Sequence, residues 1–388
     1  MRWGRKGHLI VAGVIAVLVV TGLIQAFFPQ EGRPPEAHNT NASEFLAKTY
    51  GSVMKPKIIH ACQSNAVEVL LIVPSAVNNL EARAAVRVSW LPYLPSTYHL
   101  VFFLGLTENT VLQGQVNEES RKFKDIFQDS RFIDSYYNLT LKSLAILQWT
   151  NKFCSNAKYL LKIDDDMYLN IHKLHHLTTC ITHARNNLYV SKGAAGDSRE
   201  TTEYSELSNC SLVRPYNFIH YYINSETHEY ESYFFGGYLY ENVKADRNPN
   251  SKWYLHPKLY SATTLPPFLS GTAYILTTNL IQHLIYASKF EPVIPLEDVY
   301  ITGLLGSQGL KLKLSHVEGW SRFRPRWNSL CLFQELLTAH GLSPSELSSI
   351  TSSVNNIEHE ECDRFSVRLM NYFNTLISHF FPKLSNES

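Results

Sequence analysis

Three consecutive aspartates, Asp164, Asp165 and Asp166, directly follow the apolar run Tyr159–Ile163. A short apolar run bounded by polar residues is typical of a buried strand, so the carboxylates are predicted to lie where a strand leaves its sheet. Residues two apart in an extended chain share a face, so Asp164 and Asp166 are expected to converge. Such oxygen ligands suit Mn²⁺ or Mg²⁺, which can hold a diphosphate. A solvated acidic turn is the alternative.

The elements that must position these aspartates alternate between strands and helices. Apolar runs predict strands, and helical periodicity predicts helices; the strands are 69–73, 100–104, 159–163 and 268–276, and the helices 80–90, 115–124, 138–149 and 279–288. This alternation predicts an α/β fold with a mostly parallel central sheet flanked by helices. Ligands of such sheets bind beyond the carboxyl ends of the strands, where the triplet lies. Residues 190–260, which are rich in Tyr, Asn and Glu, are expected to form loops with short strands over the site.

The N-terminal residues predict a membrane anchor. Residues 9–28 carry no formal charge and, at about 1.5 Å per residue, would span about 30 Å as a helix, the thickness of a bilayer core. Arg2, Arg5 and Lys6 precede them, which places the N-terminus in the cytosol. A cleaved signal peptide is the alternative, although no Ala-x-Ala-like cleavage site follows. We expect a cytoplasmic tail (1–8), a transmembrane signal anchor (9–28), a polar luminal stem (29–64) and a luminal domain (65–388).

Cysteines and glycosylation sequons agree with a luminal location. All six cysteines follow the anchor, where disulfides persist, and the sequence does not choose their pairing. Of the four Asn-x-Ser/Thr sequons, Asn138 is doubtful, since it can instead cap a helix from Leu139. Asn41, Asn209 and Asn386 are expected glycosylation sites. The formal net charge of +1 gives no broad electrostatic case for a nucleic-acid partner.

Four segments, in order, resemble the animal β-1,3-glycosyltransferases, the family of β-1,3-galactosyl- and β-1,3-N-acetylglucosaminyltransferases. They are Glu81–Trp90, Asp134–Lys142, Lys158–Asp166 and Glu297–Tyr300, with further likeness at Lys252–Tyr254 and Pro267–Gly271. The similarity covers about residues 67–345. Departures are mild: Val86 and Ser89 replace Ile and Thr, and Met167–Leu169 replaces a run of smaller residues.

The resemblance implies a GT-A fold, Golgi residence as a single-pass type II membrane protein, and an inverting transfer from a UDP-sugar. We expect an Mn²⁺-dependent enzyme, with Mg²⁺ as the other candidate ion. It would add a hexose to a 3-hydroxyl of a glycan acceptor on a glycoprotein or glycolipid. Galactose is favoured over N-acetylglucosamine as the donor sugar. The alternatives are a catalytically silent luminal carbohydrate-binding protein and a calcium-dependent lectin.

The same resemblance assigns residues to the metal and to the chemistry. Asp166, assisted by Asp164, is expected to hold the metal, and His340 in a His-x-x-x-Pro element would complete the site, with His316 as the rival. Asp298 is the expected catalytic base for the acceptor hydroxyl. A helix N-terminal acid ahead of residues 299–305 is its alternative role. Glu297 is expected to hold acceptor hydroxyls.

Binding of the two substrates is expected from the remaining matched residues. Donor-binding candidates are Arg83, Arg87, Asp134, Lys142, Asp164, Asp165 and Gly271. Cations complement a diphosphate, and glycine permits close approach of the backbone to a sugar. The aromatic rings of Trp253 and Tyr254 are expected to stack on an acceptor sugar. The alternatives are a solvated basic stripe for the arginines, a turn cap for Asp134, a bulge for Gly271 and core packing for the aromatic pair.

Overall fold

The computed structural model describes residues 41–48, 52–54, 62, 67–193, 219–223, 230–325 and 330–356. The described residues belong to one compact unit, Asn39–Ser388. The expected cytoplasmic tail, the expected anchor over 9–28, and the sequons at Asn209 and Asn386 lie outside them. Within the described ranges, every helix is too short or too polar to cross a bilayer.

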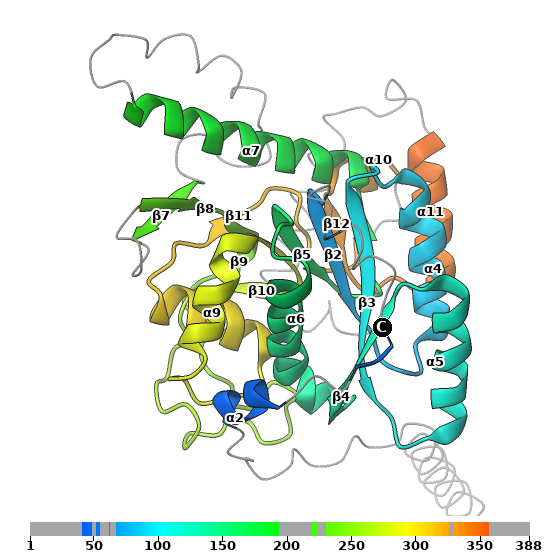
Figure 1. Ribbon diagram of the computed structural model, residues 1–388, viewed down its shortest axis with the longest axis horizontal. Coiled ribbons are helices and arrows are strands. Elements are labelled where there is room, and N and C mark those ends of the chain that lie inside the picture. Colours follow the sequence, from blue (N-terminus) through cyan, green and yellow to red (C-terminus); the bar gives the residue numbers. More distant parts are fainter. Residues whose placement is uncertain are drawn as a thin grey trace, which may run out of the picture. The chain divides into compact units, whose positions relative to one another are not determined.

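A mixed sheet runs through the described domain (Figure 1). Eight described strands follow the order β1-β4-β3-β2-β5-β10-β9-β11. The neighbours β4, β3, β2 and β5 are parallel, β10 is antiparallel to β5 and β9, β1 is antiparallel to β4, and β11 is parallel to β9. The strands are β1 (Ser52–Met54), β2 (Val69–Pro74), β3 (Tyr98–Leu106), β4 (Ile126–Ile133), β5 (Tyr159–Ile163), β9 (Phe235–Tyr240), β10 (Phe268–Thr277) and β11 (Ser315–His316). The expected α/β class with a mostly parallel centre is therefore confirmed.

Helices and two short ladders surround this sheet. The helices are α2 (Ala42–Ala47), α4 (Leu80–Trp90), η1 (Leu91–Tyr93), α5 (Thr110–Phe123), η2 (Tyr136–Asn138), α6 (Leu139–Phe153), α7 (Ile171–Gly193), η3 (Thr278–Leu280), α9 (Ile281–Ala287), the π-helix η4 (Val299–Gly309), α10 (Leu330–Glu335) and α11 (Pro344–Asn356). The ladders pair β6 (Tyr168–Leu169) with β12 (Thr338–Ala339), and β7 (His220–Ile223) with β8 (Tyr230–Tyr233).

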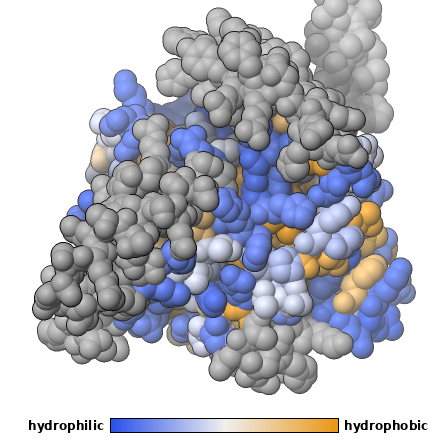
Figure 2. All heavy atoms as spheres, turned by 90° about the horizontal axis from the view of Figure 1, so that it is seen from above, coloured by the Kyte–Doolittle hydropathy of each residue, from blue (hydrophilic) through white to orange (hydrophobic). Residues whose placement is uncertain are grey.

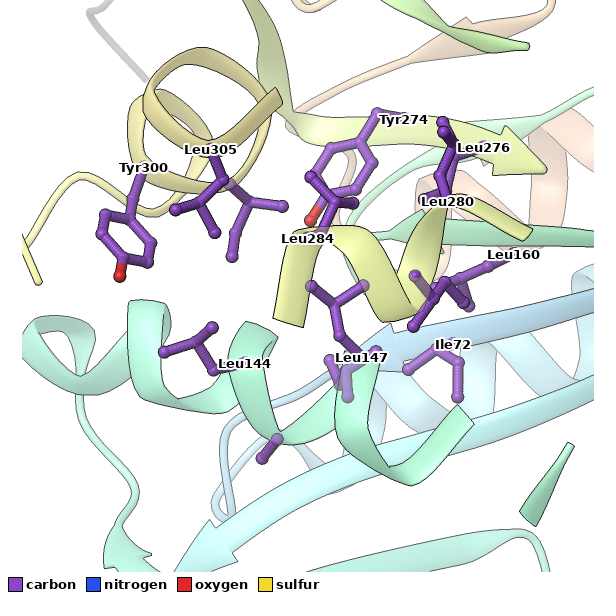
Figure 3. Close-up of a cluster of buried hydrophobic side chains, with 14 of the residues drawn as sticks. Ile72, Leu144, Leu147, Leu160, Tyr274, Leu276, Leu280, Leu284, Tyr300 and Leu305 are labelled. Atoms are coloured by element: carbon purple, nitrogen blue, oxygen red, sulfur yellow. The ribbon is translucent and has the colours of Figure 1, made fainter. Parts of the chain in front are cut away.

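Two hydrophobic cores cover the two faces of the sheet. Val69, Leu71 and Val73 of β2 pack into the core that contains buried residues of α4, α7, α10 and α11. Leu70 and Ile72, which point the other way, pack into the core with α6, α9 and η4. Figure 3 shows this second core, where side chains of α6, α9 and η4 meet those of β2, β5 and β10. Because both faces of β2 are covered, its residues form a continuous apolar run.

The expected elements that frame the triplet are confirmed. The helix over 80–90 and the strand over 159–163 have the predicted bounds, and the strands over 69–73, 100–104 and 268–276 each extend by one to four residues. Helix α5 begins at Thr110 rather than 115, because the side chain of Asn109 accepts hydrogen bonds from the backbone of Val111 and Leu112. Strand β4 and helix α7 were not predicted.

Asn138 does not cap α6 as expected. The helix does begin at Leu139, but the amide of Asn138 donates to the carbonyl of Ile133 at 2.8 Å and its side chain makes no capping bond. The short helix η2 leads directly into α6, so the chain is already helical when it reaches Asn138. The side chain instead ties the turn to the end of β4.

The described part of the segment expected to be a stem packs against the domain instead. Helix α2 begins after Asn41, whose side chain accepts from the backbone of Ser43, and it buries Phe45 against Phe132 with ring centroids 6.2 Å apart. Strand β1 pairs with β4, and a disulfide joins Cys62 to Cys154. The folded unit therefore begins before residue 65. The sequence did not predict this packing, because only a few apolar residues are scattered among the polar ones in this segment.

The remaining described cysteines also fit an oxidising compartment. Both Cys180 and Cys331 are disulfide-bonded, and no described cysteine is free. This agrees with the expectation that the cysteines form disulfides.

The docking of α2 predicts a measurable loss of stability when Phe45 is truncated. Phe45 is 3% exposed, so Phe45→Ala should lower the free energy of unfolding by about 3 kcal/mol because it empties a packed site. Chemical denaturation of the purified domain measures this. Val111→Ala, at a residue that is 69% exposed, is the control and should change stability by less than about 0.5 kcal/mol. Equal effects of the two changes would show that α2 does not contribute to the fold.

Candidate functional site

The candidate functional site lies at one edge of the sheet, where parallel strands end. Strands β2 and β5 run side by side, so the residues after their carboxyl ends, Ser75 and Asp164, reach the same edge. Strand β10 runs the opposite way, so its beginning also lies there, and it pairs Ala273 with Ile163. The aspartate triplet and Gly271 of β10 therefore lie at the same edge of the sheet.

Asp164, Asp166 and His340 form a group that could hold a metal ion. Their ligand atoms all lie within 4.8 Å of one another, and His340 Nε2 is 3.2 Å from Asp166 Oδ2. The β6–β12 ladder brings them together, because β6 follows the triplet and β12 directly precedes His340. Two carboxylates and an imidazole suit a divalent ion that accepts both oxygen and nitrogen ligands.

The electrostatics of this group reflect burial first and the neighbouring charges second. Burial raises the pKa of Asp164 to about 6; Asp166 adds to this shift, and Lys162 opposes it. Burial tends to lower the pKa of His340, but the hydrogen bond and the charge of Asp166 raise it overall. A bound cation would replace the repulsion between the carboxylates with attraction.

His316, the rival metal ligand, lies elsewhere. It belongs to β11, and its Nδ1 accepts from the backbone of Leu239 at 3.3 Å. Sequence position alone did not separate the two histidines. The pairing of β12 with β6 is the long-range contact that selects His340.

Asp165 faces away from the metal group and into the loop that follows β2. Its Oδ2 accepts from Ser75 Oγ at 2.6 Å and from Asn79 Nδ2 at 3.1 Å, and the residue is 9% exposed. Arg83 Nη1 donates to the same Ser75 hydroxyl at 3.0 Å. The middle aspartate therefore fixes the loop 75–79 beside the metal group.

Asp298 is held by two backbone N–H groups at the beginning of η4. Val299 N donates to its Oδ1 at 2.8 Å, and Gly271 N donates to its Oδ2 at 3.1 Å. Burial and the neighbouring charge of Glu297 raise the pKa of Asp298 to about 6. The alternative role as an acid at a helix N-terminus is therefore confirmed, and the raised pKa is compatible with the predicted role as a general base.

Gly271 allows this close approach. A Cβ at this position would lie 3.2 Å from Asp298 Cβ and 3.3 Å from its Oδ2. The pairing of β10 with β9 shifts register between Leu269 and Tyr274, so the glycine also lies in a bulge, as the alternative interpretation held.

Lys162 connects the metal group to Asp298 and was not predicted. Its ammonium donates to Asp164 Oδ1 at 2.9 Å and to the carbonyl of Gly271, and it lies 3.6 Å from Glu297 Oε2. The residue is only 5% exposed. Burial opposes its charge, but the carboxylates of Asp164 and Glu297 raise the pKa of Lys162 overall, so it stays protonated. The sequence did contain one indication of this residue, because a lysine within a strand predicted to be buried needs a partner for its charge.

Glu297 lies in the interior of the domain, among protein partners. It is 7% exposed, and its Oε1 accepts from Ser143 Oγ at 2.6 Å and from the Tyr274 hydroxyl at 2.8 Å. With Lys162 beside its other oxygen, the carboxylate is satisfied by protein partners. These contacts hold Glu297 beside Lys162, and its expected contact with acceptor hydroxyls stays a prediction.

The two arginines expected at the donor are buried in ion pairs. Arg83 binds Glu119 through two donors, and Arg87 binds both Glu119 and Asp125 at 2.7 Å. Arg83 also donates to backbone carbonyls of Ala76 and other residues of the loop 75–79. They are neither a solvated stripe nor free cations, because Glu119 and Asp125 neutralise them. They lock α4, α5 and the loop together.

Lys142 and Asp134 form a second buried pair at the same edge. Lys142 Nζ lies 2.6 Å from Asp134 Oδ1 and donates to the carbonyl of Ser75 at 3.0 Å. Asp134 Oδ2 accepts from the backbone of Gly105 at 2.9 Å. Burial lowers the pKa of Lys142, and Asp134 opposes this shift. This pair joins the ends of β2, β3 and β4.

The loop that carries Trp253 lies near the metal group. Trp253 is 46% exposed with Lys252 Nζ 4.7 Å from its ring centre, and the charge of Lys252 acts on His340. Core packing, the alternative for this ring, is therefore excluded. Tyr254 is half-buried, with its ring centroid 6.1 Å from that of His256.

Known proteins resemble this chain over most of its length. A family model described as Galactosyltransferase matches residues 81–205 and 209–318. The chain is 29% identical over 310 residues to beta-1,3-galactosyltransferase 2 of Homo sapiens, a match covering 78% of this chain and 62% of that protein, which is less than two thirds of it. It is 28% identical over 304 residues to beta-1,3-galactosyltransferase 1 of Mus musculus, covering 78% of each chain.

Likeness to solved structures is weak. The bifunctional glycosyltransferase WbbM in its apo form matches with 8% identity and a TM-score of 0.33, covering 78% of this chain and 51% of that one. A score this low supports no inference about fold or function.

The geometry of the metal group predicts that Asp166→Asn weakens binding of Mn²⁺. Removing a direct ligand should cost more than the roughly 10- to 100-fold typical of an outer-shell partner. Titration of free Mn²⁺ by electron paramagnetic resonance measures the affinity. Glu335→Gln, which changes an exposed carboxylate, is the control and should bind as the unchanged protein does. Unaltered Mn²⁺ affinity in Asp166→Asn would remove Asp166 from the site.

Proposed function

Because the chain belongs to the galactosyltransferase family, we propose that it transfers galactose from UDP-galactose to a 3-hydroxyl of an acceptor glycan. The proposed reaction inverts the anomeric carbon, forms a β-1,3 linkage and depends on Mn²⁺, with Mg²⁺ as the other candidate. The names of the relatives, both beta-1,3-galactosyltransferases, support galactose as the donor sugar. The acceptor would be a glycan on a glycoprotein or glycolipid.

One observation supports this function above all others. A carboxylate with a raised pKa, Asp298, is connected through Gly271 and Lys162 to a group of residues that could hold a metal. Transfer from a nucleotide sugar needs a base for the acceptor hydroxyl and a site for the departing diphosphate, at a fixed separation. The shared contacts of Lys162 fix the two parts relative to each other.

The residues suggest a single displacement. The carboxylate of Asp298 takes the proton of the acceptor 3-hydroxyl, and the hydroxyl oxygen forms a bond to C1 of the sugar. The bond from C1 to the diphosphate oxygen breaks, and its electron pair stays with the departing UDP. Attack from the side opposite the leaving group inverts C1. A divalent ion held by Asp164, Asp166 and His340 would neutralise the charge that develops on the diphosphate.

Protein contacts prepare Asp298 for this step. The N–H groups of Val299 and Gly271 each occupy one lone pair of its carboxylate and fix its orientation. Burial and Glu297 make it a stronger base than an exposed aspartate. Lys162 offsets the negative charges of Asp164 and Glu297 on either side.

We propose a GT-A domain in the Golgi lumen, held by a type II anchor at residues 9–28 and carrying glycans at Asn41, Asn209 and Asn386. The Cys62–Cys154 disulfide supports an oxidising compartment. The uncharged stretch 9–28, with basic residues before it, supports the anchor and its orientation.

The test is UDP release by the purified part of the chain from residue 39 onward. UDP-galactose and UDP-N-acetylglucosamine are each supplied with capped acceptor sugars, with and without EDTA. EDTA-sensitive release from UDP-galactose is the expected result. Release from UDP-N-acetylglucosamine alone would assign the other donor. Glycan binding without release from either donor would indicate a catalytically silent carbohydrate-binding protein.

The role of Asp298 predicts the effect of Asp298→Asn. The amide cannot accept the acceptor proton, so kcat should fall by roughly 10²- to 10⁴-fold. Binding of UDP with Mn²⁺, measured by calorimetry, should be little changed because the metal group is intact. Loss of UDP binding in this variant would show that Asp298 acts at the donor instead.

The raised pKa of Asp298 predicts how activity depends on pH. The base works only when deprotonated, so kcat at saturating Mn²⁺ should fall about tenfold per pH unit below pH about 6. Glu297→Gln removes the negative neighbour that raises this pKa, so the acid limb should move to lower pH. The other groups acting on Asp298, Lys162 and the protonated Tyr240 and Tyr274, remain. An acid limb that stays in place or moves upward would contradict this electrostatic coupling.

A further inference from the structure

Arg322 lies in a box of aromatic rings beside the candidate site. Its guanidinium carbon is 4.9 Å from the ring centre of Tyr238, 4.4 Å from that of Tyr240 and 3.9 Å from that of Phe323. We call these four residues the Arg322 box. All four are half-buried, so the cation is partly removed from water while remaining accessible.

No carboxylate in the described ranges neutralises Arg322. Its Nε is buried and has no hydrogen-bond partner, and its polar neighbour is the hydroxyl of Tyr240. Burial, opposed by the charge of Arg322, raises the pKa of that hydroxyl overall, so it stays neutral. Arg83 and Arg87, by contrast, are each paired with carboxylates. The cations that the sequence suggested for anion binding are therefore already neutralised, whereas Arg322 is not.

The Arg322 box lies next to both parts of the candidate site. Tyr240 is the last residue of β9 and pairs with Phe268 of β10, and the two rings stack with centroids 4.8 Å apart. Phe268 precedes Gly271 by three residues. The charge of Asp298 acts on the Tyr240 hydroxyl. From the other side, the backbone of His340 donates to the carbonyl of Phe323 at 3.3 Å. The loop that carries Arg322 thus connects the neighbourhood of Asp298 to that of the metal group.

The chemistry of a stacked guanidinium defines what it can bind. Aromatic rings interact with the face of the guanidinium and leave the N–H donors at its edge. These donors form a planar fork that matches two oxygens of a phosphate, carboxylate or sulfate. A partly desolvated cation without an anionic partner is also costly, so binding an oxyanion relieves that cost.

We propose that Arg322 is a substrate-binding residue whose guanidinium recognises an oxyanion carried by one of the two substrates. This inference rests on the proposed function for where the substrates lie. The oxyanion has two sources: the diphosphate of the donor, or an acidic group on the acceptor glycan. Either the diphosphate or the acidic group would reach Arg322, because it lies between Asp298 and the metal group. Binding measurements distinguish the two sources.

The donor is tested with UDP. Calorimetry with UDP and Mn²⁺ compares the unchanged protein with Arg322→Gln, Arg322→Lys and the control Arg121→Gln, an exposed arginine whose Nε donates to the carbonyl of Asn117. If the diphosphate is the ligand, Arg322→Gln weakens UDP binding about 10- to 100-fold. UMP, which lacks the second phosphate, is then affected less. Arg322→Lys restores part of the affinity because it keeps the charge but loses the planar fork.

The acceptor is tested with matched saccharides. Two disaccharides that differ only in a terminal glucuronate or glucose are titrated into the protein with UDP and Mn²⁺ present. If an acidic acceptor is the ligand, Arg322→Gln weakens binding of the glucuronate form about 10- to 100-fold and leaves the glucose form unchanged. Retained thermal stability of Arg322→Gln confirms that each loss is local.

Affinities of Arg322→Gln for UDP and for both disaccharides equal to those of the unchanged protein would overturn the proposal. Because these are binding measurements, they remain informative if the protein transfers no sugar. Absence of transfer by the unchanged protein would count against the proposed function, and the binding of UDP and of the glucuronate form would still decide the role of Arg322.

Discussion

The site depends on one buried ammonium group, that of Lys162. It contacts a carboxylate of the metal group, the carbonyl of the glycine that holds Asp298, and the carboxylate of Glu297. Without this positive charge, Asp164, Glu297 and Asp298 would place three negative charges at one partly dry edge of the sheet. A single cation thus allows the candidate metal group and the proposed general base to lie side by side.

Buried ion pairs fix the loops at this edge of the sheet. Arg83 and Arg87 share Glu119, and Lys142 joins Asp134 to the end of β2. Their charges shape the loops after the strands. Arg322 differs from them, because no carboxylate within the described ranges pairs with it and its Nε has no hydrogen-bond partner. On the face seen in Figure 2, the described surface is mostly hydrophilic, with smaller hydrophobic areas between.

The sequence predicted the centre of the fold because burial on both faces produces continuous apolar runs, as in β2, and nearly continuous ones, as in β5. It missed β4, whose charged Asp129 and Arg131 pair with each other at 2.6 Å and so tolerate burial. The aspartate triplet and Asp298 could be identified from their local patterns and from the family resemblance. The partners of Arg83 could not, since Glu119 is 36 residues away in the sequence and only the folded structure brings it close.

The two-residue ladder between β6 and β12 has a consequence for how the molecule matures. His340 reaches the aspartates only when a late segment of the chain docks against an early one, with Thr338 opposite Leu169. A nascent chain can thus build much of its sheet while its ligand set is still incomplete. If this group binds a cation as proposed, a complete site requires that β12 has paired with β6, next to α11, the final described helix, which packs against α4.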